Sequence, residues 1–296
     1  MRSELFGTPK RAIFLSTFTR STLLEECIKS ILSAQDRERY IFFLIQQGRN
    51  EDNSRIIEKY RSQIDYVFSF EGRYDSAIKN INYNRVKGYQ IAFGGLNCDY
   101  AVAVEDDVEI SRDALVFVDE MMAKFARHRN FGCVNLLSLG NPNEHEEGFS
   151  IYRSPLIGQG SAINTRLWGA FIKNGVMGRI DSEPFDGAVE DLVKCKFSIF
   201  PNRSRILDKG WEGTHSTNEN DSYFVLNKQS WVSSPQVVHG YKHIQRDLNL
   251  RKDWVPYKRR KNVYYLLRKV GLDLNRTQYG NIVVREFRKI LKLPSI

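Results

Sequence analysis

Short apolar runs alternate with helical segments in the N-terminal third of the chain, and this alternation limits the possible folds more than any other feature. An apolar run at 12–16 is followed by apolar residues at helical spacing over 23–32. Further apolar runs at 40–45, 64–68 and 100–104 are again separated by stretches of helical periodicity. Strands that alternate with helices predict a mixed, mainly parallel α/β sheet flanked by helices. Such a sheet binds its ligands at the carboxyl ends of its strands.

Charge is distributed unevenly along the chain. The 296 residues include 44 Lys and Arg and 35 Asp and Glu, but residues 242–296 hold 15 of the basic and only 4 of the acidic side chains. That segment carries a net charge of +11, and residues 1–241 carry −2. This distribution argues against a uniformly basic protein that coats nucleic acid. We therefore predict one domain over 1–241 and a basic helical appendage over 242–296.

The basic C-terminal segment has the pattern of two amphipathic helices. Apolar residues recur at helical spacing over 263–270 and 283–291, beside clusters of Lys and Arg. Such helices bind anionic membrane surfaces, where each basic residue adds about 1 kcal/mol. The alternative is a helical subdomain packed on the body or on a second copy of the chain. In the latter case the protein would be a homo-oligomer.

Two absences in the sequence bear on location. No apolar run is long enough to cross a membrane, and residues 1–10 lack the apolar core of a secretory signal. The four cysteines are widely spaced and form no CxxC pair, which predicts buried thiols in a reducing compartment. We expect a cytoplasmic protein, held at most peripherally at the inner face of the membrane. These cysteines are Cys27, Cys98, Cys133 and Cys195.

Three consecutive carboxylates, Glu105, Asp106 and Asp107, follow the apolar run at 101–104. Acids at one strand end repel one another and are costly to bury unless they share a cation. One or two carboxylates together with substrate phosphates are a typical site for Mg²⁺, and the same reasoning extends to Mn²⁺. The alternative is a polar strand end whose acids cap the next helix, with Ser111 as a candidate N-cap.

The segments 12–33, 46–48 and 104–110 together resemble the nucleotide-sugar-binding half of GT-A-fold glycosyltransferases. They are most similar to the N-acetylglucosaminyltransferase I type, family 13, and to bacterial transferases that build lipopolysaccharide or capsule glycans. The likeness extends over some two thirds of the chain. It implies a GT-A catalytic domain with a nucleotide-sugar-binding half at about 11–130 and an acceptor half at about 131–241.

The resemblance assigns roles in the first half. In these families the carboxylate triplet is the DxD-type motif, and its last acid binds Mn²⁺ or Mg²⁺. Asp107 is then the metal ligand, and Glu105 and Asp106 contact the ribose or the donor sugar. The first loop and the helix before the DxD strand become nucleotide contacts. The residues implied are Ser16, Thr17, Arg20, Asn84 and Arg85.

The nucleobase is less closely specified. In the family-13 pattern an Asp at the end of the second strand reads the uracil ring, whereas this chain has Gln47 at that position. A UDP-linked donor is favoured by the resemblance, and the identity of the base stays open.

The second half resembles the acceptor side of the same families. An Asp at a helix start there removes the proton of the acceptor hydroxyl in inverting transfer, and Asp186 matches that position, with Asp191 as the second choice. His215, in a Gly-x-x-x-Thr-His run, matches a late histidine that completes the metal site. The alternatives are that Asp186 caps a helix and that His215 is structural.

These features predict a metal-dependent, inverting glycosyltransferase. It would move a sugar from a nucleoside diphosphate, with UDP favoured, to a hydroxyl of a glycan or lipid-linked glycan in bacterial surface polysaccharide synthesis. One alternative is a nucleotidyltransferase, but the first loop at 16–20 lacks the glycines expected of one. The other is a non-enzymatic module that binds nucleic acid through the basic tail, which would leave the near-neutral body without a role. No nucleic-acid partner is expected for the transferase.

Overall fold

The computed structural model describes residues 9–48, 50–71, 77–138, 148–152, 159–175, 196–210, 227–231 and 241–243. The strands are β1 (Arg11–Thr17), β2 (Tyr40–Gln47), β3 (Tyr66–Phe70), β4 (Tyr100–Glu105), β5 (Val108–Ile110), β6 (Phe131–Asn135), β7 (Gly148–Tyr152), β8 (Ser161–Asn164), β9 (Phe197–Pro201), β10 (Ile206–Asp208) and β11 (Lys242–His243). The α-helices are α1 (Ser21–Ser33), α2 (Glu51–Lys59), α3 (Ala77–Gln90), α4 (Ala114–Phe125) and α5 (Thr165–Lys173). Short 3₁₀ turns at Arg37–Arg39 and Arg61–Gln63 precede β2 and β3, and a π-helical turn at Ile91–Gly95 extends α3.

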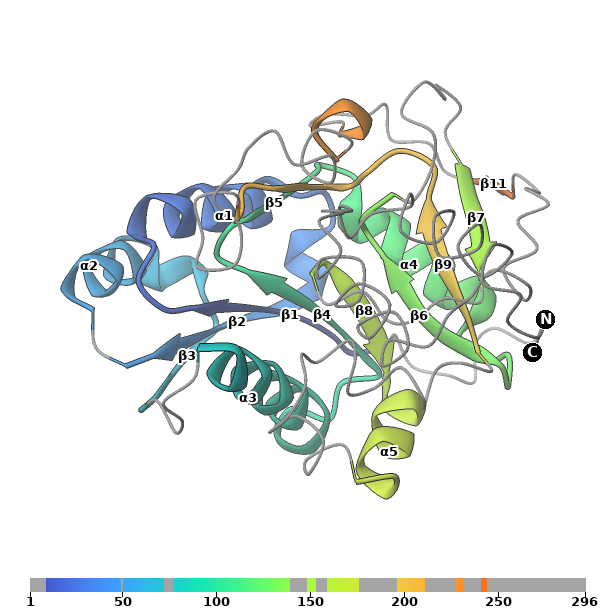
Figure 1. Cartoon of the computed structure of the whole chain (residues 1–296), viewed down its shortest axis with the longest axis horizontal. Coiled ribbons are helices and arrows are strands. Elements are labelled where there is room, and N and C mark those ends of the chain that lie inside the picture. Colours follow the sequence, from blue (N-terminus) through green and yellow to red (C-terminus); the bar gives the residue numbers. More distant parts are fainter. Residues whose placement is uncertain are drawn as a thin grey trace, which may run out of the picture.

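The described strands form one large sheet and one small ribbon (Figure 1). The large sheet has nine strands in the order β11-β7-β9-β6-β8-β4-β1-β2-β3, and β10 pairs with β5 in the ribbon. β1 is parallel to both β2 and β4, β2 is parallel to β3, and β6 is parallel to β9. β8 lies antiparallel between β4 and β6. The predicted mixed, mainly parallel sheet is confirmed.

The apolar runs predicted as strands correspond to β1 to β4. β3 spans Tyr66–Phe70 rather than the predicted 64–68, because its pairing with β2 begins at Tyr66, opposite Phe43, and runs to Phe70, opposite Gln47. In a parallel arrangement these four strands end at the same edge of the sheet, which is where ligands bind in α/β folds. The three carboxylates follow β4 at that edge.

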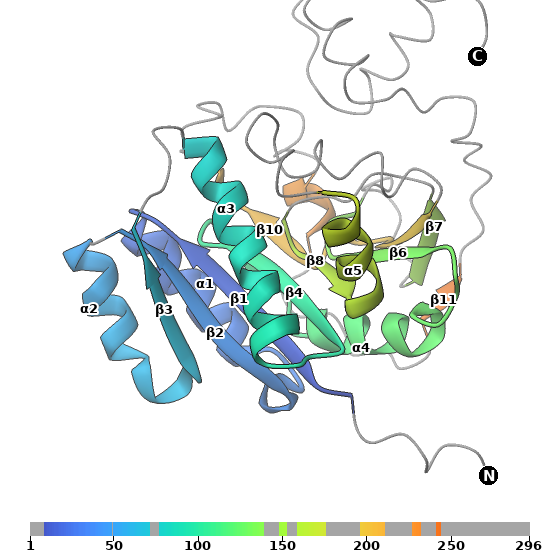
Figure 2. The same cartoon turned by 90° about the horizontal axis from the view of Figure 1, so that it is seen from below.

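Helices cover both faces of the sheet (Figure 2). Ile13 and Leu15 of β1 belong to the core under α1, α2 and α4, whereas Ala12 and Phe14 belong to the core under α3 and α5. Successive side chains of a strand point to opposite faces, so β1 contributes to both cores in turn. The sheet is therefore the middle layer of three.

α3 packs closely on β1 because it carries a glycine where the two meet. A Cβ built at Gly88 would lie 2.3 Å from the ring of Phe14. That ring stacks on Phe43 and meets Tyr89 edge to face, with centroids 5.4 Å and 5.1 Å away. The close packing fixes the position of α3 above the strand that ends in the first loop.

Two helices begin at an asparagine whose side chain accepts a backbone hydrogen bond, Asn50 at α2 and Asn164 at α5. α4 differs from the prediction. Its N-cap is Asp113, and the hydroxyl of Ser111 donates to the Asp113 carboxylate at 2.7 Å instead of capping the helix. That carboxylate also accepts from Nε of the fully buried Arg205 at 2.9 Å. Ser111 as N-cap is wrong because its hydroxyl is used in this buried ion-pair network.

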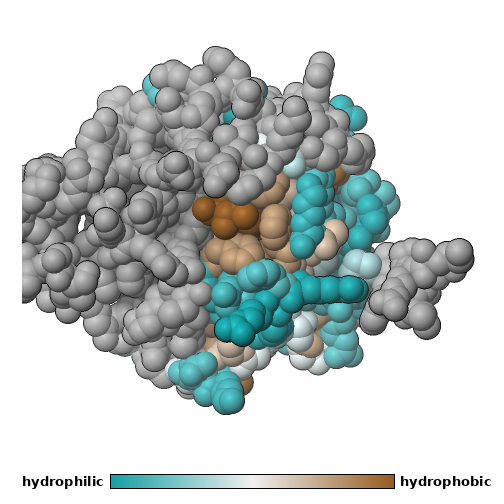
Figure 3. All heavy atoms as spheres, turned by 90° about the vertical axis from the view of Figure 1, so that its right-hand side faces the viewer, coloured by the Kyte–Doolittle hydropathy of each residue, from teal (hydrophilic) through white to brown (hydrophobic). Residues whose placement is uncertain are grey.

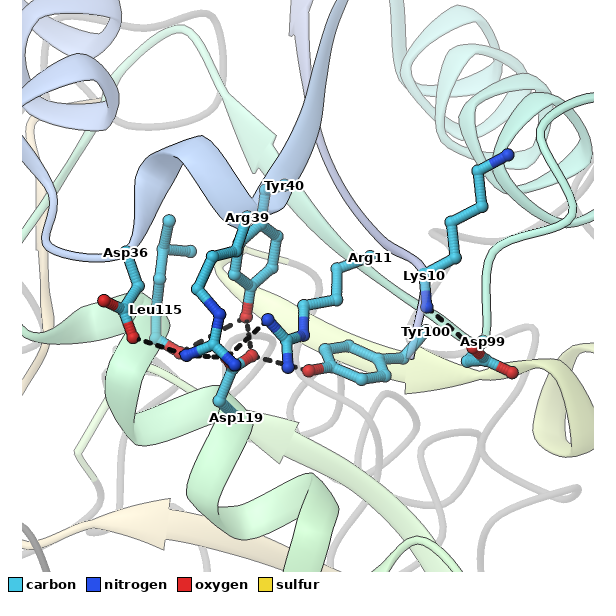
Figure 4. A network of polar contacts seen from close by, with 9 residues as sticks. All are labelled: Lys10, Arg11, Asp36, Arg39, Tyr40, Asp99, Tyr100, Leu115 and Asp119. Atoms are coloured by element: carbon cyan, nitrogen blue, oxygen red, sulfur yellow. Dashed lines mark hydrogen bonds and ion pairs between the residues drawn. The ribbon is translucent and has the colours of Figure 1, made fainter. Parts of the chain in front are cut away.

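A second buried polar network closes the amino ends of β1, β2 and β4 (Figure 4). Arg11, Tyr40 and Tyr100 are register partners at the starts of these strands, and all three reach Asp119 of α4. The Tyr100 hydroxyl donates to Asp119 Oδ1 at 2.5 Å, and Arg11 Nη1 lies 3.2 Å from Oδ2. Arg39 Nη1 lies 3.7 Å from the same Oδ2 atom. We define Arg11, Arg39, Tyr40, Tyr100 and Asp119 as the amino-edge network, which ties α4 to the sheet.

The described surface bears on the remaining expectations. The side of the molecule on which β7 lies carries an apolar patch bordered by hydrophilic residues (Figure 3), and Ile151 of β7 is 37% exposed. None of the helices in the described part of the chain has the length and apolar character needed to span a bilayer. Cys27, Cys98 and Cys133 are buried free thiols, as predicted. Residues 244–296, most of the predicted basic tail, and Cys195 lie outside the described residues.

Candidate metal and nucleotide site

The predicted carboxylates lie at the carboxyl edge of the sheet, beside the end of β1. Ser16 of β1 is the register partner of Glu105, the last residue of β4. A turn at Asp106 and Asp107 then leads into β5. Asp106 is 7% and Asp107 6% exposed, so both carboxylates are buried at an edge where a strand meets a loop.

Asp106 holds the first loop in place. Its Oδ2 accepts from Thr17 Oγ1 at 2.8 Å and from the Phe18 backbone N–H at 3.1 Å. Asn53 of α2 donates to Thr17 Oγ1 and to the Phe18 carbonyl, both at 2.9 Å. Burial raises the pKa of Asp106, and the hydrogen bonds from Thr17 and Phe18 oppose that rise. Asp106 therefore connects the end of β4 to the first loop, where Thr17 and Arg20 are predicted nucleotide contacts.

Asp107 has an excess of negative charge around it. Arg20 Nη1 contacts Asp107 Oδ2, whereas Oδ1 is buried and has no hydrogen-bond partner among the described residues. Burial and the nearby charges of Glu105, Asp208 and Asp106 raise the pKa of Asp107 to about 8, although Arg20 acts in the opposite direction. A buried carboxylate in this setting is stabilised by a further cation.

Two other predicted residues reach the same edge from α3. Arg85 contacts the Glu105 carboxylate through Nη2, and its side chain is only 5% exposed. Asn84 donates to Gln47 Oε1 at 2.6 Å. The Ser16 hydroxyl donates to the Val104 carbonyl at 3.4 Å, so it also lies against β4. The structure thus brings together the nine predicted site residues that it describes. They are Ser16, Thr17, Arg20, Gln47, Asn84, Arg85, Glu105, Asp106 and Asp107.

One acid at this edge was not predicted from the sequence. Asp208 ends β10, which pairs antiparallel with β5 so that Asp208 lies opposite Val108. The Lys209 N–H donates to the Asp107 carbonyl at 2.8 Å, and the Gly210 N–H donates to Asp208 Oδ1 at 2.8 Å. The only sequence signal was an acid at the end of a short apolar run, followed two positions later by a glycine.

A cavity of about 770 Å³ lies at the carboxyl ends of β2 and β3, beside the start of α2. Gln46, Gly48, Ser54 and Phe70 are among the residues that line it. Gln47, the neighbour of Gln46 on β2, binds Asn84 instead. Adjacent strand residues point to opposite faces, so Gln46 and Gln47 serve different surroundings.

The carboxylate oxygens at the carboxyl edge of the sheet suit a divalent cation. The described residues contain no cluster of three His, Cys, Asp or Glu side chains that could hold a metal. Mg²⁺ needs only one or two protein carboxylates when substrate phosphates complete its ligand shell. Asp107, which has one buried oxygen without a partner among the residues that the structure describes, has the chemistry for that role.

Three predicted site residues, Asp186, Asp191 and His215, lie outside the described residues, so the general base and the histidine ligand stay predictions.

Comparison with known proteins gives low-identity likenesses. No protein-family model and no curated protein matches the chain. Among solved structures, the chain is similar to the mannosyltransferase PcManGT of Pyrobaculum calidifontis, which was solved in complex with GDP-Man and Mn²⁺. The identity is 13% and the TM-score is 0.40, and the match covers 56% of this chain and 47% of that chain. Residues 1–349 of S. aureus TarS give 10% identity, coverage of 69% and 61%, and a TM-score of 0.46. A cytidylyltransferase of Leptospira borgpetersenii gives 12% identity, coverage of 56% and 65%, and a TM-score of 0.35. The chain spans about half the length of the mannosyltransferase and about three fifths of the TarS fragment.

Proposed function

We propose that the chain is a metal-dependent glycosyltransferase that uses a nucleoside diphosphate sugar as donor. The observation that carries the proposal is Asp107, a buried carboxylate at the carboxyl edge of a mainly parallel sheet, one of whose oxygens has no hydrogen-bond partner in the part of the chain that the structure describes. The resemblance of the carboxylate triplet to a DxD-type motif supports the same reading. Asp107 would hold Mn²⁺ or Mg²⁺, which when bound stabilises the negative charge of the departing diphosphate.

The protein groups around Asp107 suit a nucleoside diphosphate. Arg20 is 29% exposed and contacts Asp107, so its guanidinium can also reach a phosphate that lies beside the cation. The cavity beside Gln46 and Phe70 offers an amide and an aromatic ring, which are groups that bind a nucleobase by hydrogen bonding and stacking. Arg85 neutralises Glu105 and so limits the negative charge that the diphosphate meets.

The finer features of the proposal rest on the sequence resemblance. Asp186 would remove the proton of the acceptor hydroxyl, with Asp191 as the second choice, and His215 would be a further metal ligand. The transfer would be inverting, from UDP by preference, to a glycan or lipid-linked glycan of a bacterial surface polysaccharide. The basic segment 242–296 would hold the enzyme at the anionic inner face of the membrane.

A nucleotidyltransferase would use a similar sheet but release pyrophosphate from a nucleoside triphosphate. Asp106 holds the glycine-free first loop against β4, which does not favour a loop that closes around a triphosphate. The two activities differ in their donors, so one experiment can separate them.

The test is thermal unfolding with a panel of nucleotides, nucleotide sugars and nucleoside triphosphates, with Mn²⁺ or with EDTA. A ligand that binds only the folded chain stabilises it by about 2.7 kcal/mol at 100 times its Kd. We expect one nucleoside diphosphate sugar to raise the Tm with Mn²⁺ and much less with EDTA. Failure of every nucleotide to raise the Tm with Mn²⁺ would contradict the proposal, and a response to triphosphates alone would favour the nucleotidyltransferase.

A further inference from the structure

We propose that the turn after α4 belongs to a surface that binds the anionic phospholipid headgroups of a bilayer. Five basic side chains from three separate segments meet there, and we call them the basic turn surface. They are Lys124, Arg127, Arg129, Arg166 and Lys196. The inference goes beyond the proposed function, because it concerns the body of the protein and needs neither a nucleotide nor a metal.

Hydrogen bonds to the turn bring the three segments together. Arg166, at the start of α5, donates to the carbonyls of Arg127 and His128 at 3.3 Å and 2.5 Å. Lys196, just before β9, donates through Nζ to the Arg129 carbonyl at 3.4 Å. Basic side chains that bond the last carbonyls of a helix stabilise its end. The turn therefore carries its arginines on a backbone that is held from two sides.

The basic turn surface has an excess of positive charge. Its three arginines are exposed, and the side chain of Lys124 is 41% exposed. Two described acids lie beside it: Glu120, which pairs with Lys124 at 2.5 Å, and Asp99, whose carbonyl accepts from the Thr165 N–H at 3.0 Å. Five bases beside two acids suit a negatively charged partner. They do not suit the C-terminal segment 242–296 as an occupant, since that segment carries +11.

Aromatic rings lie among the basic side chains. Phe125 of α4 and Phe197 of β9 are partly buried, and their ring centroids lie 6.0 Å apart. The ring of Phe149 of β7 lies 5.5 Å from that of Phe125, and the Lys124 ammonium lies 5.7 Å from the Phe149 centroid. Figure 3 shows an apolar patch bordered by hydrophilic residues on this side of the molecule. Basic groups beside apolar rings are typical of elements that bind the interface of an anionic bilayer.

The basic C-terminal segment starts beside the same surface. β11, which holds the last described residues, pairs with β7, and Lys124 Nζ donates to the Tyr241 carbonyl at 3.4 Å. The sequence beyond β11 has the amphipathic pattern of helices that bind membranes. Two basic elements that start on one side of the molecule can bind one bilayer, and the first contact then raises the effective concentration for the second. The apolar residues of both elements favour a bilayer over a nucleic acid.

The experiment measures binding of the full chain to phosphatidylcholine vesicles, with and without phosphatidylglycerol, by co-sedimentation. The variant carries Arg127→Gln and Arg129→Gln. The matched control carries Arg55→Gln and Arg61→Gln, which remove the same charge from exposed residues of α2 and of the turn after it. Arg55 pairs with the exposed Asp52 at 2.8 Å, and α2 lies on the opposite side of the molecule from β7 (Figure 1).

We expect the wild type to bind only the vesicles that contain phosphatidylglycerol. Each basic residue at an anionic surface strengthens binding about fivefold, so the double variant should bind these vesicles about 30-fold more weakly. The control should bind as the wild type does. Equal binding by the folded variant and the control would overturn the inference, because the C-terminal segment would then account for binding alone. A wild type that binds neither kind of vesicle, or both equally, would overturn it as well.

Thermal unfolding shows whether the variants fold. If the double variant does not, Arg129→Gln alone should weaken vesicle binding about fivefold, and unchanged binding would contradict the inference. The same variants are also titrated with single-stranded RNA. RNA binding that falls in the double variant while vesicle binding does not would assign the surface to nucleic acid and overturn its role at a bilayer.

Discussion

Strands β1, β2 and β4 end in buried polar residues at both edges of the sheet, but the two edges balance their charges differently. At the amino edge Asp119 meets two tyrosine hydroxyls and two arginines, one of which, Arg39, also pairs with Asp36 at 2.8 Å (Figure 4). At the carboxyl edge Arg20 contacts Asp107 and Arg85 contacts Glu105. Among the described residues, two arginines thus match two carboxylates at the first edge, whereas two arginines meet the three carboxylates of the triplet at the second.

The difference separates a structural network from the site that we propose for a ligand. Burial raises the pKa of Tyr40 and of Tyr100, so both phenols stay protonated and donate to Asp119. Burial also raises the pKa of Asp107, to about 8, but there neighbouring acids add to the effect. The amino edge pairs its charged groups within the protein, whereas the carboxyl edge holds the carboxylates that we propose to bind a cation.

The largest predicted effect is a loss of turnover on removal of a charge at the carboxyl edge. Asp107→Asn should lower donor turnover at least about 100-fold, because the charge that holds the cation at the departing diphosphate is lost. The measurement is release of nucleoside diphosphate from the donor identified by thermal unfolding, with Asp52→Asn as control. Turnover within a few-fold of the wild type would move the metal role to another residue.

The matching change at the amino edge should act on stability instead. Asp119→Asn removes the charge that pairs with buried Arg11, and breaking a buried pair costs about 3 kcal/mol or more. Urea unfolding should report this loss in the free energy of unfolding. The Mn²⁺ affinity of the folded variant should equal that of the wild type, and a loss of Mn²⁺ binding would erase the distinction between the edges.

The pH dependence of stability should also differ between the edges. With EDTA present, Asp107 is protonated in the folded chain up to a pKa of about 8, whereas its ordinary value is 3.8. The folded chain then holds the extra proton between these values, so this group makes the free energy of unfolding fall as pH rises through that window. Asp107→Asn should remove this contribution, by more than about 1.4 kcal/mol, the equivalent of one pKa unit. Urea unfolding gives the free energy of unfolding at each pH. If this free energy changed equally with pH in the wild type and the variant from pH 5 to about 8.5, the prediction would be wrong.

The smallest predicted effect concerns the cavity beside β2. Gln46→Ala should weaken nucleotide binding about fivefold to tenfold, the equivalent of one net hydrogen bond, because Gln46 lines the cavity. Isothermal titration with the bound nucleotide measures it, and the exposed Gln63→Ala provides the control. Unchanged affinity would place the nucleobase elsewhere.

Local sequence patterns predicted much of the fold and the charged end of β4. Apolar runs and helical spacing located β1 to β4, and three acids after an apolar strand indicated a charged strand end. These signals are local, since each one depends on residues within a few positions of one another.

What the sequence did not predict depends on pairing between distant segments. Asp208 reaches Asp107 only because β10 pairs with β5, and the amino-edge network forms only because Arg11, Tyr40 and Tyr100 share a register. The family resemblance predicted a nucleotide contact at Gln47. Side chains alternate between the two faces of β2, however, and it is the neighbouring Gln46 that lines the cavity.

Metal-dependent nucleotide binding is tested most directly by titration of UDP and GDP into the chain at neutral pH, with Mn²⁺ and with EDTA, for wild type, Asp107→Asn and Asp119→Asn. We expect one nucleotide to bind at least about tenfold more tightly with Mn²⁺, a difference of 1.4 kcal/mol. This gain should be absent from Asp107→Asn and present in folded Asp119→Asn. Equal affinity with Mn²⁺ and EDTA, or a Mn²⁺ effect that survives in Asp107→Asn, would contradict it.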